Sequence, residues 1–125
     1  MKIVNYLDIE GMEFPAGRRT RVVVGPNGAL EAEHFVQGMV VIYPGGSVPL
    51  HDHAEEEVYF IVSGSGEMTV GEETVAVKEG DAVYITPTLP HLLKNTGKDD
   101  MKMMFTYAPK KIADHWEQEK QGHLK

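Results

Sequence analysis

The 125-residue sequence predicts an all-β fold, and three observations support this prediction. Glycine and proline interrupt the chain at intervals of roughly 8 to 12 residues, which is the spacing of turns in sandwiches and barrels. Short runs rich in β-branched and aromatic residues lie between these interruptions, as is typical of strands. No helical hydrophobic period separates the runs, so alternating β–α units are not expected. The fold class that follows is an antiparallel sandwich or barrel.

Eight runs satisfy the strand pattern in chain order. They cover residues 21–24, 35–43, 58–62, 67–70, 74–77, 82–85, 91–94 and 101–107. Gly71-Glu72-Glu73 is expected to turn the chain between two of them. After the last run, residues 110–120 contain no glycine or proline, and their apolar residues recur at helical spacing. This segment predicts one short amphipathic C-terminal helix with Trp116 on its packed face.

Composition limits the classes of protein to consider. A length of 125 residues and a mass of 13.9 kDa predict a single domain over 1–125. Twelve Lys and Arg against nineteen Asp and Glu give a net charge of −7 without a basic patch, which argues against nucleic-acid and membrane partners. The N-terminus does not resemble a signal peptide, and the absence of cysteine fits a reducing compartment, so we expect a cytoplasmic protein.

Without cysteine, a metal ion would have to be held by histidine and carboxylate side chains. His51 and His53 are two residues apart, and in an extended chain such side chains point to the same side. Glu57 follows with the same parity, and His91 lies on a distant predicted strand. The alternative interpretation is a solvated acidic loop, to which we assign the neighbouring Glu55 and Glu56.

At these positions the sequence resembles the cupin superfamily, in the form of a small single-domain cupin of the conserved-barrel, RmlC-like type. The first cupin motif is matched by Gly45, His51, His53, Glu57 and Gly64, and the second by Gly80, His91 and Asn95. The second motif departs from the family pattern at Thr86, where proline is usual, and at Thr88, where glycine is usual. The resemblance implies a double-stranded β-helix, or jelly-roll, barrel with a metal ion inside.

Three imidazoles and one carboxylate form a mixed nitrogen and oxygen site that suits one divalent transition metal. Iron or manganese is favoured, with nickel, zinc, cobalt and copper as alternatives. Two adjacent coordination positions would stay open for substrate or dioxygen. Tyr59, Phe105 and Tyr107 are expected to line the pocket. One of Arg18, Arg19 and Arg21 could neutralise a substrate carboxylate, while the others lie on a solvated face.

Cupins include dioxygenases, decarboxylases, isomerases, lyases and proteins that only bind small molecules, so the fold does not fix the activity. We expect a small metalloenzyme that acts on an oxygen-rich small molecule such as a hydroxy acid, dicarboxylate, sugar derivative or phenol. The alternative is a non-catalytic module that binds or senses a sugar or carboxylate. No general acid or base can be assigned from the sequence. A homodimer is also expected, because edge strands need cover and the segments 1–24 and 108–121 could provide it.

Overall fold

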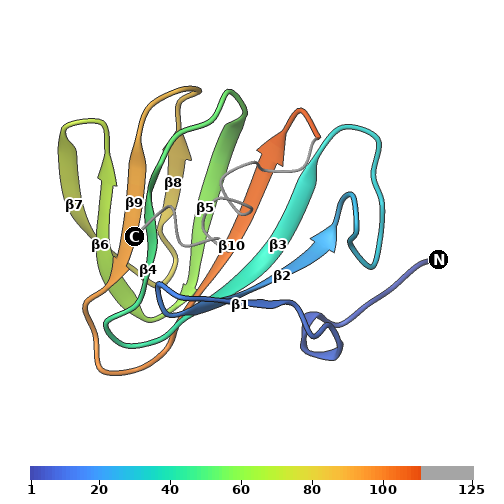
Figure 1. Ribbon diagram of the computed structural model, residues 1–125, viewed down its shortest axis with the longest axis horizontal. Helices are drawn as coiled ribbons and strands as arrows, with labels where there is room; N and C mark the ends of the chain where they lie inside the picture. Colours follow the sequence, from blue (N-terminus) through green and yellow to red (C-terminus); the bar gives the residue numbers. More distant parts are fainter. Residues whose placement is uncertain (111–125) are drawn as a thin grey trace.

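The protein folds into two antiparallel β-sheets that pack face to face, as Figure 1 shows for the computed structural model, which describes residues 1–110. A single-turn 3-10 helix, η1, covers Tyr6–Asp8. The strands are β1 (Met12–Phe14), β2 (Arg18–Val24), β3 (Val36–Ile42), β4 (Ser47–His51), β5 (Glu56–Ser63), β6 (Ser65–Val70), β7 (Glu73–Lys78), β8 (Ala82–Ile85), β9 (His91–Asn95) and β10 (Met101–Ala108).

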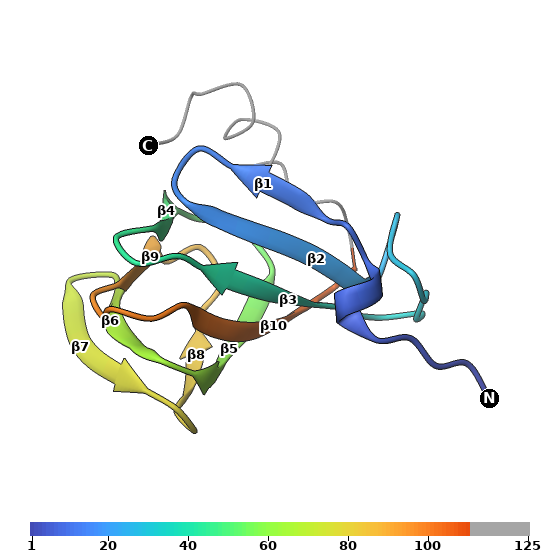
Figure 2. The same cartoon turned by 90° about the horizontal axis from the view of Figure 1, so that it is seen from below.

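One sheet has six strands in the order β1-β2-β3-β10-β5-β8, and the other has four in the order β4-β9-β6-β7. The last described strand, β10, pairs with both β3 and β5, so contacts between distant parts of the chain build the centre of the larger sheet. Viewed from below, the two sheets curve around a common interior (Figure 2). The predicted all-β jelly-roll fold is confirmed. The C-terminal helix expected over residues 110–120 lies outside the described residues except for Lys110, which is not in a helix.

All eight predicted runs are strands, with ends that differ by up to three residues. β1 and β4 were not among them. Pro49 lies inside β4, and proline weakens a strand pattern because it cannot donate a backbone hydrogen bond. β1 pairs with β2, and β2 with β3, so residues 12–24 extend this chain's own sheet.

Alternation along β5 shows how the sequence fills the interior. Tyr59 and Ile61 are 3% and 0% exposed, whereas their neighbours Val58, Phe60 and Val62 are 37–38% exposed on the outer face. Side chains two residues apart share one face of a strand, so Glu57 is directed inward with Tyr59. In the described chain, no helix is long and apolar enough to cross a membrane.

Candidate metal centre

The structure brings together the four residues that the spacing predicted as ligands. His51 ends β4 and His91 begins β9, and the two residues are direct partners in the register of these strands. Glu57 is the second residue of β5, on the opposite sheet, and His53 lies in the connection between β4 and β5. One ligand atom from each of the four lies within 4.8 Å of all the others. Both sheets therefore contribute to a single cluster.

The backbone fixes the orientation of each imidazole. Nδ1 of His51 lies 2.6 Å from the carbonyl oxygen of Pro49, and Nδ1 of His53 lies 3.0 Å from that of Glu55. Nδ1 of His91 lies 3.0 Å from the carbonyl oxygen of Leu89. A carbonyl oxygen only accepts, so each Nδ1 carries the proton and donates it. The neutral form of each ring then has its lone pair on Nε2, which is the tautomer that binds a metal ion.

The Nε2 atoms meet around the Glu57 carboxylate. Nε2 of His53 is 3.0 Å from Oε1 of Glu57, and Nε2 of His91 is 3.5 Å from the same oxygen. Nε2 of His91 is fully buried and makes no hydrogen bond to any group in residues 1–110. Buried polar atoms are rarely left without a partner. A cation at the centre of the cluster would satisfy this atom and offset the carboxylate charge, so the donor set fits a divalent metal ion.

In the metal-free cluster, the pKa shifts favour one proton that is shared between His53 and Glu57. Burial, together with the adjacent His91, lowers the pKa of His51 to about 3, so this ring is neutral. For His53, burial acts to lower the pKa, but the hydrogen bond and negative charge of Glu57 outweigh it, and the pKa is raised. For Glu57, burial acts to raise the pKa, but the hydrogen bond with His53 and the nearby His91 ring outweigh it, and the pKa is lowered. A metal ion must therefore displace the proton that His53 shares with Glu57.

Thr88, one of the departures from the cupin motif, has a strained backbone conformation. Its φ is +71°, a left-handed conformation that is strained for a β-branched residue and natural for the glycine usual at this position. The Thr88 N–H donates to the carbonyl oxygen of His53 at 2.8 Å. The turn before His91 therefore also holds the loop that carries His53.

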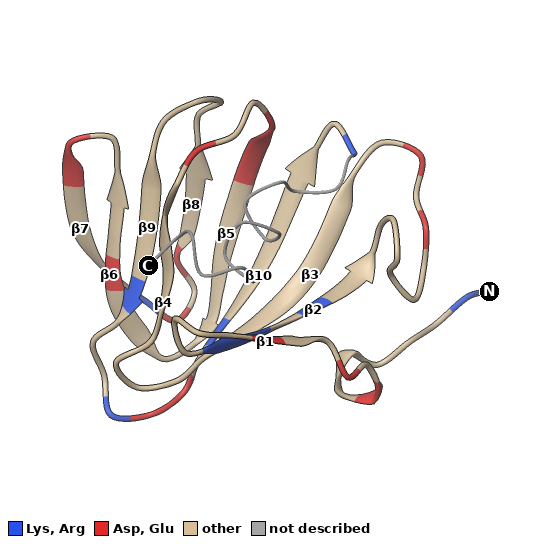
Figure 3. Cartoon of the chain, viewed as in Figure 1, with Lys and Arg blue, Asp and Glu red and all other residues tan. Residues whose placement is uncertain are grey.

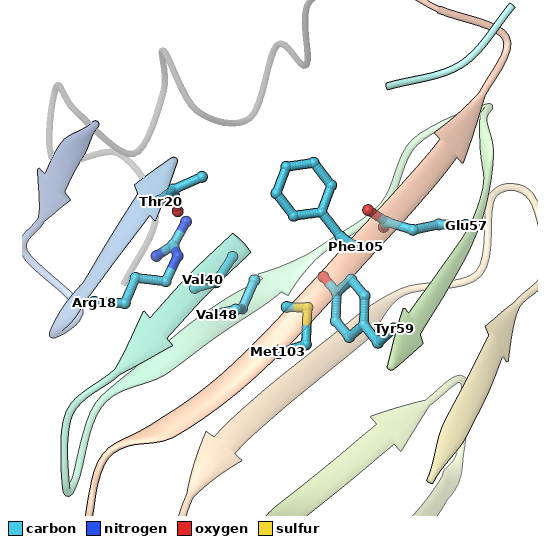
Figure 4. Close-up of a pocket in the computed structure, with 8 residues that line it drawn as sticks. All are labelled: Arg18, Thr20, Val40, Val48, Glu57, Tyr59, Met103 and Phe105. Carbon is cyan, nitrogen blue, oxygen red and sulfur yellow. The ribbon is translucent and has the colours of Figure 1, made fainter. Parts of the chain in front are cut away.

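Tyr59 and Phe105 line an internal cavity that reaches the cluster at Glu57 (Figure 4). Tyr107 does not line this cavity. Its ring centroid lies 6.3 Å from that of His53, and burial, together with the charges of Glu57 and Glu55, raises the pKa of its hydroxyl. Tyr107 thus lies beside the cluster and not in the wall of the cavity.

Of the three arginines at the start of β2, one side chain is buried and the other two are partly exposed, as expected. Arg18 is 1% exposed and lines the cavity. Arg19 forms an ion pair with Glu13 at 3.0 Å, and Nε of Arg21 donates to the carbonyl oxygen of Ile9 at 2.8 Å. Both remain partly exposed.

The assignment of Glu55 to a solvated acidic loop is wrong. Its side chain is buried, with the residue 3% exposed, and Oε1 lies 3.7 Å from Nδ1 of His53. The acidic run Glu55-Glu56-Glu57 gave no local signal that Glu55 is buried. Strand parity with Glu57 was the available clue, because the two residues are two positions apart.

Comparison with known proteins agrees with this geometry. The sequence model of the cupin domain family matches residues 38–107, so the chain belongs to this family. An uncharacterized protein of Methanocaldococcus jannaschii is 38% identical over 70 residues, which are 55% of this chain and 56% of that protein. An oxalate-binding protein of Thermotoga maritima is 36% identical over 62 residues, covering 49% of this chain and 51% of that protein. The chain thus spans about half the length of these two relatives.

A crystal structure described as a predicted oxalate decarboxylase from Thermotoga maritima superimposes with a TM-score of 0.74. The match covers 86% of this chain and 99% of that one at 21% identity, which establishes the shared fold. Family and fold together define a cupin with a cluster that could hold a metal ion.

Proposed function

We propose that this cupin is a metal-dependent enzyme that acts on an oxygen-rich small molecule, such as a hydroxy acid, dicarboxylate, sugar derivative or phenol. The observation that carries the proposal is the convergence of the ligand atoms of His51, His53, Glu57 and His91 within 4.8 Å, in a buried site beside an internal cavity. Three of these residues have Nδ1 fixed by backbone carbonyls, so the site is organised before any metal binds.

A bound divalent ion, with iron or manganese favoured, would supply Lewis acidity toward substrate oxygens. The chain's own residues set the surroundings of that site. Glu57 brings a negative charge that balances the ion, and it borders the cavity through which a substrate would approach. Tyr59 and Phe105 provide aromatic walls of this cavity. The reaction class stays open among decarboxylation, oxidation by dioxygen, isomerisation and elimination.

The test is a comparison of two carboxylates on the same strand. Protein loaded with Fe²⁺ or Mn²⁺ is screened against hydroxy acids, dicarboxylates, uronic acids and catechols, with and without oxygen. Glu57→Gln should weaken metal binding and strongly reduce turnover. Glu56→Gln should change neither, because Glu56 is exposed on the outer face, where its carboxylate accepts from the Tyr84 hydroxyl. The absence of bound metal after repletion would refute the proposal.

The second candidate function is a non-catalytic binding or sensing module. The similarity to a protein named as oxalate-binding favours it, since that protein has 36% identity to this chain in the matched region. Tight binding of one screened compound without conversion under any metal would support this candidate over the enzyme.

We also propose that the protein is a cytoplasmic homodimer without nucleic-acid or membrane partners. Support for the dimer comes from the outer face of β5, where Val58, Phe60 and Val62 are 37–38% exposed in a row. Adjacent exposed apolar side chains on a sheet are typical of an association surface. The composition without cysteine supports the location.

A further inference from the structure

Residues 1–5 form an arm that extends away from the body of the protein (Figures 1 and 2). Its apolar side chains face solvent, and Ile3 is 85% exposed. Within residues 1–110, no backbone hydrogen bond joins residues 1–4 to the rest of the chain. An extended apolar segment without partners in its own chain is suited to docking on a sheet of another molecule.

An apolar groove lies on the outer face of the larger sheet, at the side where β8 forms the edge. Its volume is about 200 Å³, which is enough for an aliphatic side chain. The outward-facing residues that line it are Glu56, Val58, Tyr84, Thr106 and Ala108. Tyr84 is 56% exposed, and its hydroxyl donates to Oε1 of Glu56 at 3.0 Å. The groove thus combines apolar walls with one carboxylate.

The register of the larger sheet aligns a row of outer-face residues from β2 to β8. Met104 of β10 is the partner of both Met39 and Phe60. Met39 is in turn the partner of Arg21, and Phe60 is the partner of Ala82. Met39 and Met104 are half-buried and Phe60 is 37% exposed, so the middle of the row is apolar. Met104 stands at its centre, with two strands on either side.

A twofold axis along β10 makes this row complementary to itself. If the outer faces of two copies pack together, the axis exchanges positions at equal distances from β10. Met39 then lies opposite the partner's Phe60, and Arg21 lies opposite the partner's Ala82. The apolar residues meet in the centre, and β2 of each copy lies over β8 of the other.

The arm begins over β2, on this same outer face. Tyr6 follows the arm, and the Arg21 guanidinium lies 5.7 Å from the centre of its ring. Ile3 is three residues from Tyr6, so it can lie at most about 10 Å away. The chain's own β8 is four strands from β2, which is about 19 Å. Packed sheets are about 10 Å apart, so only the partner's β8 is within reach of Ile3.

The charges of the arm and the groove are complementary. The arm is basic near its start, and the start of β5 is acidic (Figure 3). Lys2 and Glu56 are both exposed. Because Lys2 is adjacent to Ile3, it lies close to the partner's Glu56 when Ile3 occupies the groove. Such a pair at the rim of an interface favours the correct register more than it adds affinity.

We propose that two copies of this chain pair through the outer faces of their larger sheets and exchange arms, with Ile3 of each copy in the groove beside Tyr84 of the other. This inference rests on the dimer of the proposed function and assigns it a symmetry and a second contact. Within the described chain, β8 pairs only with β5, so its free edge can also accept backbone hydrogen bonds from the arm. Each arm thereby covers an edge strand of its partner.

The first test measures the dissociation constant of the dimer by sedimentation equilibrium. Ile3→Asp should raise this constant by at least about tenfold, because it places a carboxylate in an apolar groove beside Glu56. Val75→Asp is the matched control, since Val75 is 49% exposed on β7 of the smaller sheet. It should change the constant by less than about twofold. Both side chains are exposed in the single copy, so both variants should fold.

The second test identifies the contact by cross-linking. The chain contains no cysteine, so introduced thiols are the only ones present. Protein with Ile3→Cys is mixed with protein with Tyr84→Cys and treated with a short bismaleimide. The mixture should form a covalent dimer that contains one chain of each kind. A control mixture of Ile3→Cys and Val75→Cys proteins should form none.

Arm exchange is overturned if Ile3→Asp leaves the dissociation constant unchanged, or if the mixture of Ile3→Cys and Tyr84→Cys proteins forms no covalent dimer. The dimer of the proposed function then still stands, provided that the wild-type protein dimerises. A wild-type protein that sediments only at 13.9 kDa overturns both. Assemblies larger than a dimer would overturn the twofold arrangement, because arms passed in one direction from copy to copy build an open chain. Failure of the proposed metal-dependent activity appears separately, as a protein that takes up no Mn²⁺.

Discussion

Affinity for Mn²⁺ should fall as the pH is lowered, because a proton and the metal ion compete for His53. In the metal-free protein, the Glu57 carboxylate lies 3.0 Å from Nε2 of His53 and raises the pKa of this ring above its ordinary 6.5, so competition begins at a higher pH than it would for an ordinary imidazole. Below that pKa, the affinity for the metal ion falls tenfold for each pH unit, which is about 1.4 kcal/mol, because the ion must displace the proton on His53. His51 adds no proton in this range, since burial lowers its pKa to about 3.

The expected profile is a decline of at least about tenfold per pH unit below the pKa of His53, and no contribution from this residue above it. Calorimetric titration with Mn²⁺ between about pH 5 and pH 8 measures the affinity, and repeating it in buffers of different ionisation enthalpy counts the protons released. Glu57→Gln removes the hydrogen-bonded charge, so burial should dominate and shift the onset for His53 to lower pH. Glu56→Gln is the matched control and should keep the wild-type onset.

Two outcomes would refute this reasoning. The first is a metal affinity that stays constant between about pH 5 and pH 7, which would mean that no ligand carries a proton there. The second is an unchanged onset in Glu57→Gln, which would show that the carboxylate does not control the protonation of His53.

Three further predictions concern stability and assembly. Asn95→Ala should lower the free energy of unfolding, measured by urea titration, by about 3 kcal/mol. The variant loses three hydrogen bonds, with Ile42, Asp99 and Gly97, at about 1 kcal/mol each. A loss below about 1 kcal/mol would contradict this prediction. Thr88→Gly should raise the free energy of unfolding by up to about 1 kcal/mol, because relief of the strained φ exceeds the entropic cost of glycine. A lower stability of this variant would argue against strain at Thr88. Phe60→Lys should convert the proposed dimer to a monomer in sedimentation at micromolar concentration, whereas a wild-type protein that sediments only at 13.9 kDa would exclude the dimer itself.

Local sequence patterns were sufficient to predict eight of the ten described strands and the set of four candidate ligands. The period of two along β5 directs Glu57, Tyr59 and Ile61 to one side, and this alternation is visible without knowledge of any partner strand. Gly71, at φ +61°, makes the predicted turn between β6 and β7, because such a backbone conformation favours glycine. The cupin motif likewise depends on residue type and spacing alone.

Tertiary structure decided everything that depends on which surfaces meet. Arg18 and Arg19 are adjacent and chemically identical, yet only Arg18 lines the cavity, because successive side chains point to opposite faces of β2 and only one face is turned toward the interior between the two sheets. Glu55 belongs to an acidic run and is nevertheless buried in the folded protein. Thr20 and Glu57 line the same cavity although they lie on β2 and β5, which β3 and β10 join into one sheet. Sequence thus determined local conformation and the donor atoms, whereas the pairing and packing of strands distant in sequence determined which side chains are buried and which line the cavity.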